Sequence, residues 1–171
     1  MRRFSVLAAS TIALMVAIFV AGQARATNHS QAEITALQER LITAIRVKDY
    51  DAIMACYIPG EKLFVFDVVP PRQYVGAPAY KDDWKAALTP FKGPVTVTMT
   101  DLTIISNGSD LAYGHSIQDF SGVDSNGAKL AFVLRATDIY RKVNGNWLIE
   151  HEHYSVPVDL TTAKADLMSK P

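Results

Sequence analysis

Hydrophobic residues in the first half of the chain recur at the spacing of an α-helix. One apolar stripe consists of Ile34, Leu37, Leu41, Ala44 and Ile45. Just before it, residues 30–33 read Ser-Gln-Ala-Glu, a capping box in which serine and glutamate oxygens accept hydrogen bonds from free amides of the first turn. We therefore predict that this helix begins at Ser30. A second, short helix is predicted for residues 51–57, with Pro59 and Gly60 ending it.

A third helix is predicted between Pro78 and Pro90. Its apolar face carries Tyr80, Trp84, Ala87 and Leu88, and its charged residues are Lys81, Asp82, Asp83 and Lys85. The charged residues fall largely opposite the apolar ones on a helical projection. We expect the apolar face to pack against the core and the charged face to meet solvent.

Strand-like runs dominate the second half of the chain. Four runs rich in β-branched and aromatic residues span residues 95–105, 111–120, 129–142 and 147–156. Each is joined to the next by a segment that contains an Asn-Gly pair, a dipeptide that favours tight hairpin turns. Shorter strands are predicted at residues 63–69 and 73–75. Helices followed by an antiparallel meander predict an α+β fold, in which the sheet curls and the helices cover its concave face.

The first 26 residues have the composition of a secretory signal peptide. Two arginines precede the uncharged residues 6–22, whose purely apolar core is 11 residues long. A bilayer span needs about 20 residues. The small-x-small pattern of residues 24–26 suits a signal peptidase. We expect residues 1–26 to be a signal peptide and 27–171 to be one periplasmic or secreted domain; an uncleaved membrane anchor is the alternative.

Charge and cysteine content narrow the classes of function. The chain has 17 basic and 17 acidic residues, and loss of the three arginines in the signal segment leaves a net charge of about −3. No basic cluster follows residue 26, so we expect neither nucleic-acid binding nor, after signal removal, membrane association. Cys56 is the one cysteine. The domain therefore depends on a packed core, in which Cys56 is expected to be a buried small hydrophobe.

Turn arithmetic predicts which residues face each other in the sheet. A hairpin centred on Asn-Gly 144–145 places Asp138 opposite His151. A hairpin centred on Asn-Gly 126–127 places His115 opposite Asp138. His115, Asp138 and His151 would then form one row, with His153 diagonal to Asp138. A single bulge in the loop of residues 122–128 would turn His115 away.

The predicted row suggests acid–base chemistry. Its face also carries Trp147, Ile149, Tyr140, Leu134, Phe132 and Ile117. The opposite face mixes Arg141, Glu150, Glu152 and Arg135. We therefore place Asp138 in an apolar pocket, where it orients an imidazole while His151 or His115 moves a proton. The alternative is a buried polar network that only holds the strands in register.

Other residues are candidates for chemistry or ligand contact. Asp67 ends an apolar strand and is either a base at the pocket mouth or a turn residue. The ligand-contact candidates are His153, Tyr57, Trp84, Tyr154 and Phe66. His151 and His153, two apart on one strand, have a spacing found in metal sites with a carboxylate such as Asp138. Because no further ligand cluster is fixed by short spacing, we expect no metal and no cofactor. No phosphate-binding loop or serine-hydrolase motif is present in the sequence.

Several of these residues resemble one known family. Phe-Asp at 66–67 precedes Pro-Pro at 70–71, Arg-Ala-Thr-Asp follows at 135–138, and the chain continues with Gly-Asn-Trp-Leu-Ile-Glu-His-Glu-His-Tyr-Ser-Val-Pro at 145–157. This pattern resembles the SnoaL-like, ketosteroid-isomerase-like branch of the NTF2-like superfamily over about residues 30–160. The resemblance implies an α+β cone with a deep pocket, and homodimers formed through the sheet.

The resemblance also implies a class of function. Isomerases and cyclases of this fold use a pocket carboxylate to abstract a proton next to a carbonyl, while a hydrogen-bond donor holds the oxyanion. Asp67 or Asp138 would be the base, and Tyr57, His115 or His153 the donor. We therefore expect an exported pocket protein for a small, largely apolar carbonyl compound, with isomerase-, cyclase- or dehydratase-type proton transfer. The alternative is a periplasmic binding module without catalysis.

Overall fold

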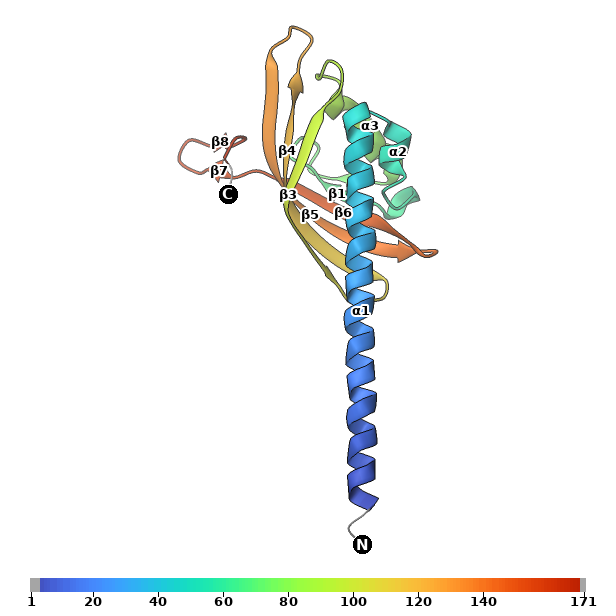
Figure 1. The fold of residues 1–171 in the computed structure, drawn as a ribbon. Coiled ribbons are helices and arrows are strands. Elements are labelled where there is room, and N and C mark those ends of the chain that lie inside the picture. Colours follow the sequence, from blue (N-terminus) through green and yellow to red (C-terminus); the bar gives the residue numbers. More distant parts are fainter. Residues whose placement is uncertain (1–3, 170–171) are drawn as a thin grey trace.

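The computed structural model describes residues 4–169, with side chains from residue 26 onward. Helix α1 (Phe4–Val47) runs through most of the first 47 residues. The predicted start at Ser30 was therefore wrong. The preceding 29 residues contain no proline and one glycine, so nothing local ends the helix before the folded domain. In Figure 1 the N-terminal part of α1 extends away from the rest of the molecule.

The predicted signal peptide falls largely outside the described part of the chain. Residues 1–3 are not described, and neither are the side chains of residues 4–25. The signal peptide and its cleavage after Ala26 stay predictions. Within residues 26–169, no helix is long and apolar enough to cross a membrane.

Two further α-helices form where the sequence predicts them. Helix α2 (Tyr50–Met54) is capped by Asp49, whose side chain accepts a hydrogen bond from the Ala52 amide at 3.0 Å. A 3-10 turn, η1 (Gly60–Lys62), follows it. Helix α3 (Ala77–Leu88) buries Tyr80, Asp83, Trp84 and Leu88. The prediction that Asp83 lies on the solvent face was therefore wrong. Asp83 follows Tyr80 by about one turn and lies on the buried side of the helix.

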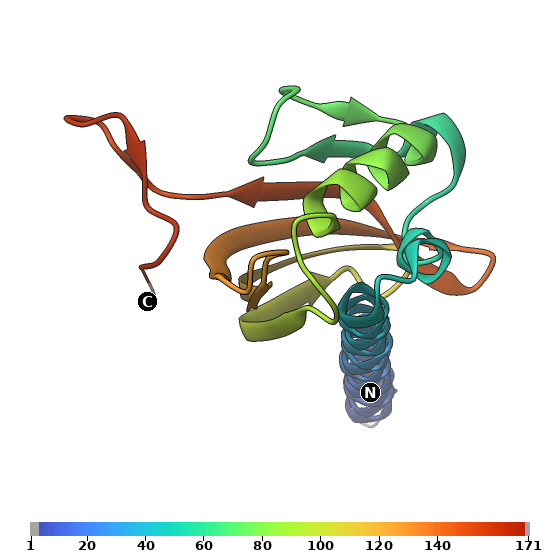
Figure 2. The ribbon, with the colours of Figure 1, turned by 90° about the horizontal axis from the view of Figure 1, so that it is seen from above.

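The predicted meander is present and forms most of a curved sheet. Its strands are β1 (Phe64–Phe66), β2 (Tyr74–Val75), β3 (Thr96–Ser106), β4 (Leu111–Val123), β5 (Lys129–Val143) and β6 (Asn146–Ser155). Their order is β2-β1-β6-β5-β4-β3, with β1 parallel to β6 and the other pairs antiparallel. A hairpin of β7 (Val158–Asp159) and β8 (Lys164–Ala165) follows. Figure 2 shows the long strands curving beside α1.

The β4–β5 turn differs from the predicted one. Asp124 donates its amide to the Ala128 carbonyl at 2.9 Å, and Gly127 donates to the Asp124 carbonyl at 3.1 Å. Gly127 has a φ of 81°. This is a three-residue loop with glycine in the left-handed position, one residue longer than the assumed register requires. His115 consequently faces Thr137, and Gly114 faces Asp138.

The β5–β6 turn is the predicted two-residue type, but a bulge follows it. Asn144 and Gly145 both have positive φ, 50° and 83°, and Tyr140 faces Ile149 as expected. The register then shifts between Tyr140 and Ile139, so that Asp138 faces Glu152 instead of His151. The extra residue in β6 moves each later side chain of that strand to the other face of the sheet.

These two shifts overturn the predicted row of titratable groups. His115 and His153 are exposed and His151 is half-buried. All three lie on the outer face, where His115 and His153 flank Thr137. Glu152 and Tyr154 take the inner face and are buried with Asp138. The inner placement of Asp138, Tyr140, Trp147, Ile149 and Leu134 is confirmed, since all five are buried. Ile117, also expected there, instead faces Arg135 on the outer face.

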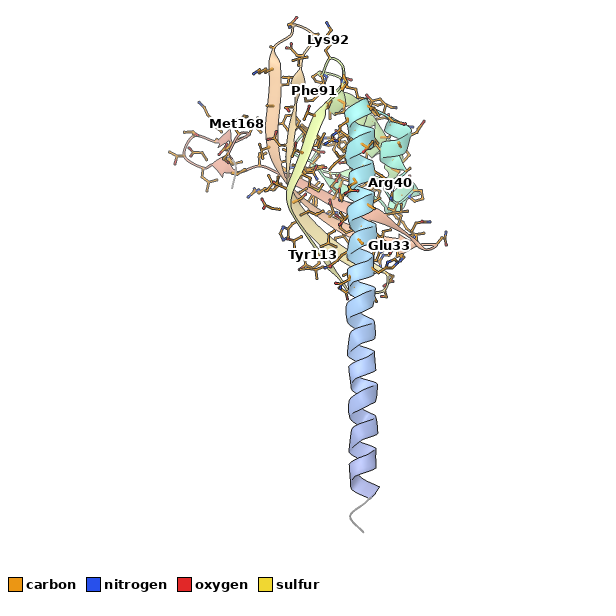
Figure 3. All side chains as sticks on the ribbon, in the orientation of Figure 1. Glu33, Arg40, Phe91, Lys92, Tyr113 and Met168 are labelled. Carbon is orange, nitrogen blue, oxygen red and sulfur yellow. The ribbon has the colours of Figure 1, made fainter. Side chains whose placement is uncertain are left out.

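Helix α1 is anchored to the sheet by its apolar stripe and by polar contacts. The stripe predicted from the sequence is buried throughout. Glu33 accepts hydrogen bonds from Lys142 Nζ at 2.7 Å and from Trp147 Nε1 at 3.0 Å. Figure 3 labels Glu33 and Arg40 on this helix. Cys56 is buried as predicted, and burial raises the pKa of its thiol.

Candidate functional site

A cavity of about 790 Å³ lies between α3, the loop after β1 and the inner face of the sheet. Its walls are mainly apolar and aromatic, with contributions from Trp84, Leu88, Phe120, Phe132, Leu134, Tyr154 and Val156. Its charged lining residues, Asp67, Asp82 and Asp83, are all acidic. Such a cavity accommodates a small molecule that is largely apolar. The negative wall disfavours an anionic ligand.

A carboxyl pair is the main titratable feature of this cavity. Asp67 comes from the loop after β1 and is half-buried, whereas Asp83 comes from α3 and is buried. When one of the two carboxyl groups carries a proton, the two side chains interact through a hydrogen bond. This bond raises the pKa of Asp67 and lowers that of Asp83. When the pair binds a single proton, Asp67 is therefore the group that carries it.

The surroundings of the pair favour a base that works near neutral pH. Burial, followed by the charge of Asp83, raises the pKa of Asp67 to about 6. Burial also raises the pKa of Asp83, against the lowering effect of hydrogen bonds from Tyr74 and Asp67. A carboxyl group with a pKa near 6 is mostly ionised at pH 7 and is a stronger base than an ordinary aspartate.

Trp84 is the candidate hydrogen-bond donor of the cavity. Its side chain lines the cavity and is only 5% exposed. Its indole N–H has no acceptor among the described residues. Buried donors normally have a partner. The nitrogen itself has almost no accessible surface, so a ligand oxygen reaches this N–H only when neighbouring side chains move aside. Trp84 and Tyr154, both ligand-contact candidates from the sequence, line the cavity. Their contact with a ligand stays a prediction.

A second carboxyl pair, Asp138 and Glu152, lies outside the set of cavity-lining residues. Gln38 donates to Asp138 Oδ2 at 2.7 Å, and Tyr140 donates to the same oxygen at 2.9 Å. Tyr57 donates to Glu152 Oε2 at 2.9 Å, and Tyr80 donates to that oxygen as well.

Both carboxyl groups of this second pair are completely enclosed. Burial raises the pKa of Asp138 to about 6. Burial, and then the negative charge of Asp138, raises the pKa of Glu152 well above its usual range. Asp138 is therefore buried and polar as predicted, but its neighbours are tyrosines, a glutamine and a glutamate rather than histidines. Tyr57, another contact candidate, belongs to this enclosed network.

The remaining predicted residues gather on the outer face of the sheet. The His151 ring stacks on Phe64 with centroids 5.9 Å apart, and Phe66 packs edge-on against both His151 and His153 at 5.6 Å. His151 Nδ1 lies 2.8 Å from the Phe64 carbonyl oxygen. The cavity lining includes none of His115, His151, His153 and Phe66. Within the described side chains, no group of three or more His, Cys, Asp or Glu residues could hold a metal ion.

The sequence analysis did not identify two of these carboxylates as site residues: Asp83, which lines the cavity, and Glu152, which belongs to the enclosed pair. Asp83 could have been found from its spacing, since it lies three residues after Tyr80 and next to Trp84, on the buried side of the helix. No comparable signal marks Glu152. The bulge that turns it inward lies near residues 150 and 151, and neither is a glycine, the residue that often marks a bulge.

Solved structures with the same fold support the architecture. An NTF2-like protein of unknown function from Pseudomonas putida KT2440 is 31% identical, with a TM-score of 0.75, over 85% of this chain and 99% of that chain. An NTF2-like superfamily protein from Salmonella enterica serovar Typhimurium is 18% identical, with a TM-score of 0.68, over 78% and 94%. The association domain of CaMKII from C. elegans is 17% identical, with a TM-score of 0.62, over 75% and 97%.

Sequence comparison gives the same assignment. No curated protein matches the chain. Residues 34–159 match the SnoaL-like domain, which covers the curved sheet, α2, α3 and most of the packed part of α1. The chain therefore belongs to the SnoaL-like family of the NTF2-like superfamily.

Proposed function

We propose that the protein binds a small, largely apolar carbonyl compound in the cavity beside α3 and catalyses proton transfer on it. The observation that carries this proposal is the Asp67–Asp83 pair in a mainly apolar cavity of about 790 Å³. An apolar wall holds the body of the ligand, and a carboxylate of raised pKa takes a proton. The raised pKa of a cleft residue is a recognised mark of functional sites.

The proposed chemistry uses two residues of the cavity. The Asp67 carboxylate takes a proton from the carbon next to the carbonyl. The electron pair of that C–H bond forms a carbon–carbon double bond, and the carbonyl oxygen becomes an enolate oxygen. The unpartnered Trp84 N–H donates a hydrogen bond to that oxygen. Return of the proton from Asp67 to a carbon completes the transfer. Asp67 is favoured over Asp138 because Asp138 does not line the cavity.

Hydrogen–deuterium exchange tests the proposal directly. The protein is incubated in D2O with a straight-chain 2-alkanone, and loss of the α-proton signal is followed by NMR. We expect exchange above the buffer rate, and at least about a 100-fold loss in Asp67→Asn. Asp51→Asn is the matched control, because Asp51 is exposed and pairs with Lys81 outside the cavity. Binding without exchange would instead support the non-catalytic binding module.

We propose that the protein is exported and that residues 1–26 are removed. The packed side chains of α1 begin at Ser30, the first buried one in the described part of the helix. A chain that begins at Thr27 therefore keeps these contacts. Intact-mass analysis of protein recovered from the periplasm or medium should give the mass of residues 27–171. Recovery of the full-length chain from the membrane fraction would support the uncleaved anchor.

We also propose a homodimer formed through the outer face of the sheet. Ile105, Tyr113, Ile139, His151 and Phe64 form one row across five strands. Ile105 is 47% and Tyr113 46% exposed. An apolar row of this kind suits a second copy of the same surface. Light scattering should give the mass of two chains, and Tyr113→Glu should yield monomers.

A further inference from the structure

The C-terminal segment of residues 157–169 supplies part of the cavity wall. Ala165 and Leu167 line the cavity together with α3 and the sheet. Residues beyond 159 lie outside the match to the SnoaL-like domain. This part of the wall is therefore an addition to the matched domain, and nothing assigned so far gives it a role. Figure 3 labels Met168, which marks the segment to one side of the sheet.

The segment is held mainly by its own contacts. The Asp159 side chain accepts hydrogen bonds from the amides of Thr161 at 2.8 Å and Thr162 at 3.2 Å. Asp166 likewise accepts from the amides of Met168 at 3.1 Å and Ser169 at 3.0 Å. These two turns set the local backbone conformation of the segment, and Leu167 lies within the second of them.

One backbone hydrogen bond ties Leu167 to the body of the fold. Val133 of β5 donates its amide to the Leu167 carbonyl at 2.8 Å. The pairing of β5 with β6 ends at Arg135 and Ser155, so Leu167 occupies the place where β6 would have continued. The bond places Leu167 next to Phe132, another cavity residue. Leu167 thus enters the cavity from the side of β5, whereas Asp67 and Asp83 come from the β1 loop and α3.

We propose that Leu167 is a specificity-determining residue that limits the length of the apolar part of the ligand. This inference rests on the proposed function, because it assumes a ligand whose carbonyl lies at Asp67 and whose apolar end extends toward Leu167. Leu167 is 43% exposed, so its side chain can be changed without opening the core. Leu160 of the same segment is 93% exposed and does not line the cavity, which makes it a matched control.

A series of straight-chain 2-alkanones of increasing length tests the proposal. In the wild type, calorimetric affinity should rise about fourfold for each added methylene until the chain reaches Leu167, and then stop rising. Leu167→Ala should move this limit to longer ketones, and Leu167→Trp to shorter ones. Leu160→Ala and Leu160→Trp should leave it unchanged. The same limit in the wild type and both Leu167 variants would overturn the proposal.

A neutral fluorescent probe, N-phenyl-1-naphthylamine, separates this inference from the proposed function. If the wild type binds this probe but no ketone, the carbonyl proposal fails. If the probe affinity changes in the Leu167 variants but not in the Leu160 variants, the proposal that Leu167 forms part of the cavity wall is still supported. If ketones and probe bind equally well to all variants, the wall proposal fails and the carbonyl proposal stands. If the wild type binds neither, both proposals are wrong.

Discussion

The two carboxyl pairs of this protein show how access to a cavity separates structural from chemical roles. In both pairs burial raises the pKa of the carboxyl groups. Asp138 and Glu152 are enclosed by Gln38 and three tyrosines, which donate to them. Asp67 and Asp83 line a cavity. Raised pKa alone therefore does not identify a catalytic group, since a ligand must also reach it.

The largest expected difference between the pairs is in stability. Glu152→Ala removes the acceptor of the Tyr57 and Tyr80 hydroxyls and leaves a cavity. We expect the free energy of unfolding to fall by about 3–5 kcal/mol. Asp67→Ala should change it by less than about 1 kcal/mol, because Asp67 is half-buried beside a cavity. Urea denaturation measures both. Equal losses would show that the two pairs do not differ in role.

The enclosed pair should also control how stability depends on pH. The ordinary pKa of an aspartate, 3.8, is raised to about 6 for Asp138 in the folded state. The folded protein then binds the proton more tightly than the unfolded chain does. The contribution of this group is present below pH 4 and is lost as pH rises through 6, a decrease on the order of 2–3 kcal/mol.

Asp138→Asn removes this titration, because asparagine does not bind a proton, and it also removes the charge that raises the pKa of Glu152. The difference in unfolding free energy between wild type and variant, measured by urea denaturation across pH 4–7, should follow the predicted decrease. A difference that stays constant with pH would mean that Asp138 does not carry the proton equilibrium assigned to it.

The coupling within the cavity pair should have a smaller effect. Asp83→Asn removes the negative charge that helps to raise the pKa of Asp67. Burial, the larger cause, remains. The midpoint of the pH profile for α-proton exchange should therefore move to lower pH by less than about 1 unit, or about 1 kcal/mol. An upward shift would contradict the pKa-raising effect of Asp83 on Asp67.

The outer-face histidines should have the smallest effect on the cavity. His115 is exposed and faces Thr137. His115→Ala should change the free energy of unfolding by less than about 0.5 kcal/mol and leave the affinity for cavity ligands unchanged. A large loss of ligand binding or of α-proton exchange would restore the histidine-based site that the sequence suggested.

The hydrophobic pattern predicted most of the elements but not the site. Period-3.6 and strand-like runs placed two helices and four long strands correctly, because burial of one face imposes that periodicity. The register of the strand pairs was harder to predict. Asp124 followed by Gly127 is a signal for the longer β4–β5 loop, since aspartate is favoured at the first position of a type I turn and glycine at the fourth. Recognising it would have placed His115 on the outer face.

The β6 bulge has no comparable signal, and the site depends on it. Had the two-residue turn set the whole pairing, His151 would face Asp138. One extra residue exchanges the faces instead, so that Glu152 and Tyr154 pack inward. Such a bulge reflects how six strands, α1 and α3 fit together, not a local preference of two or three residues.

Periodicity and turn chemistry act locally, and they therefore predicted the α+β class, most of the elements, the buried stripe of α1 and the inward position of Asp138. The tertiary structure decided which carboxyl groups pair and which of them line a cavity. It also brought Leu167, beyond the matched domain, into the same wall. These contacts join residues far apart in the chain, and a shift of one residue in register is enough to exchange them.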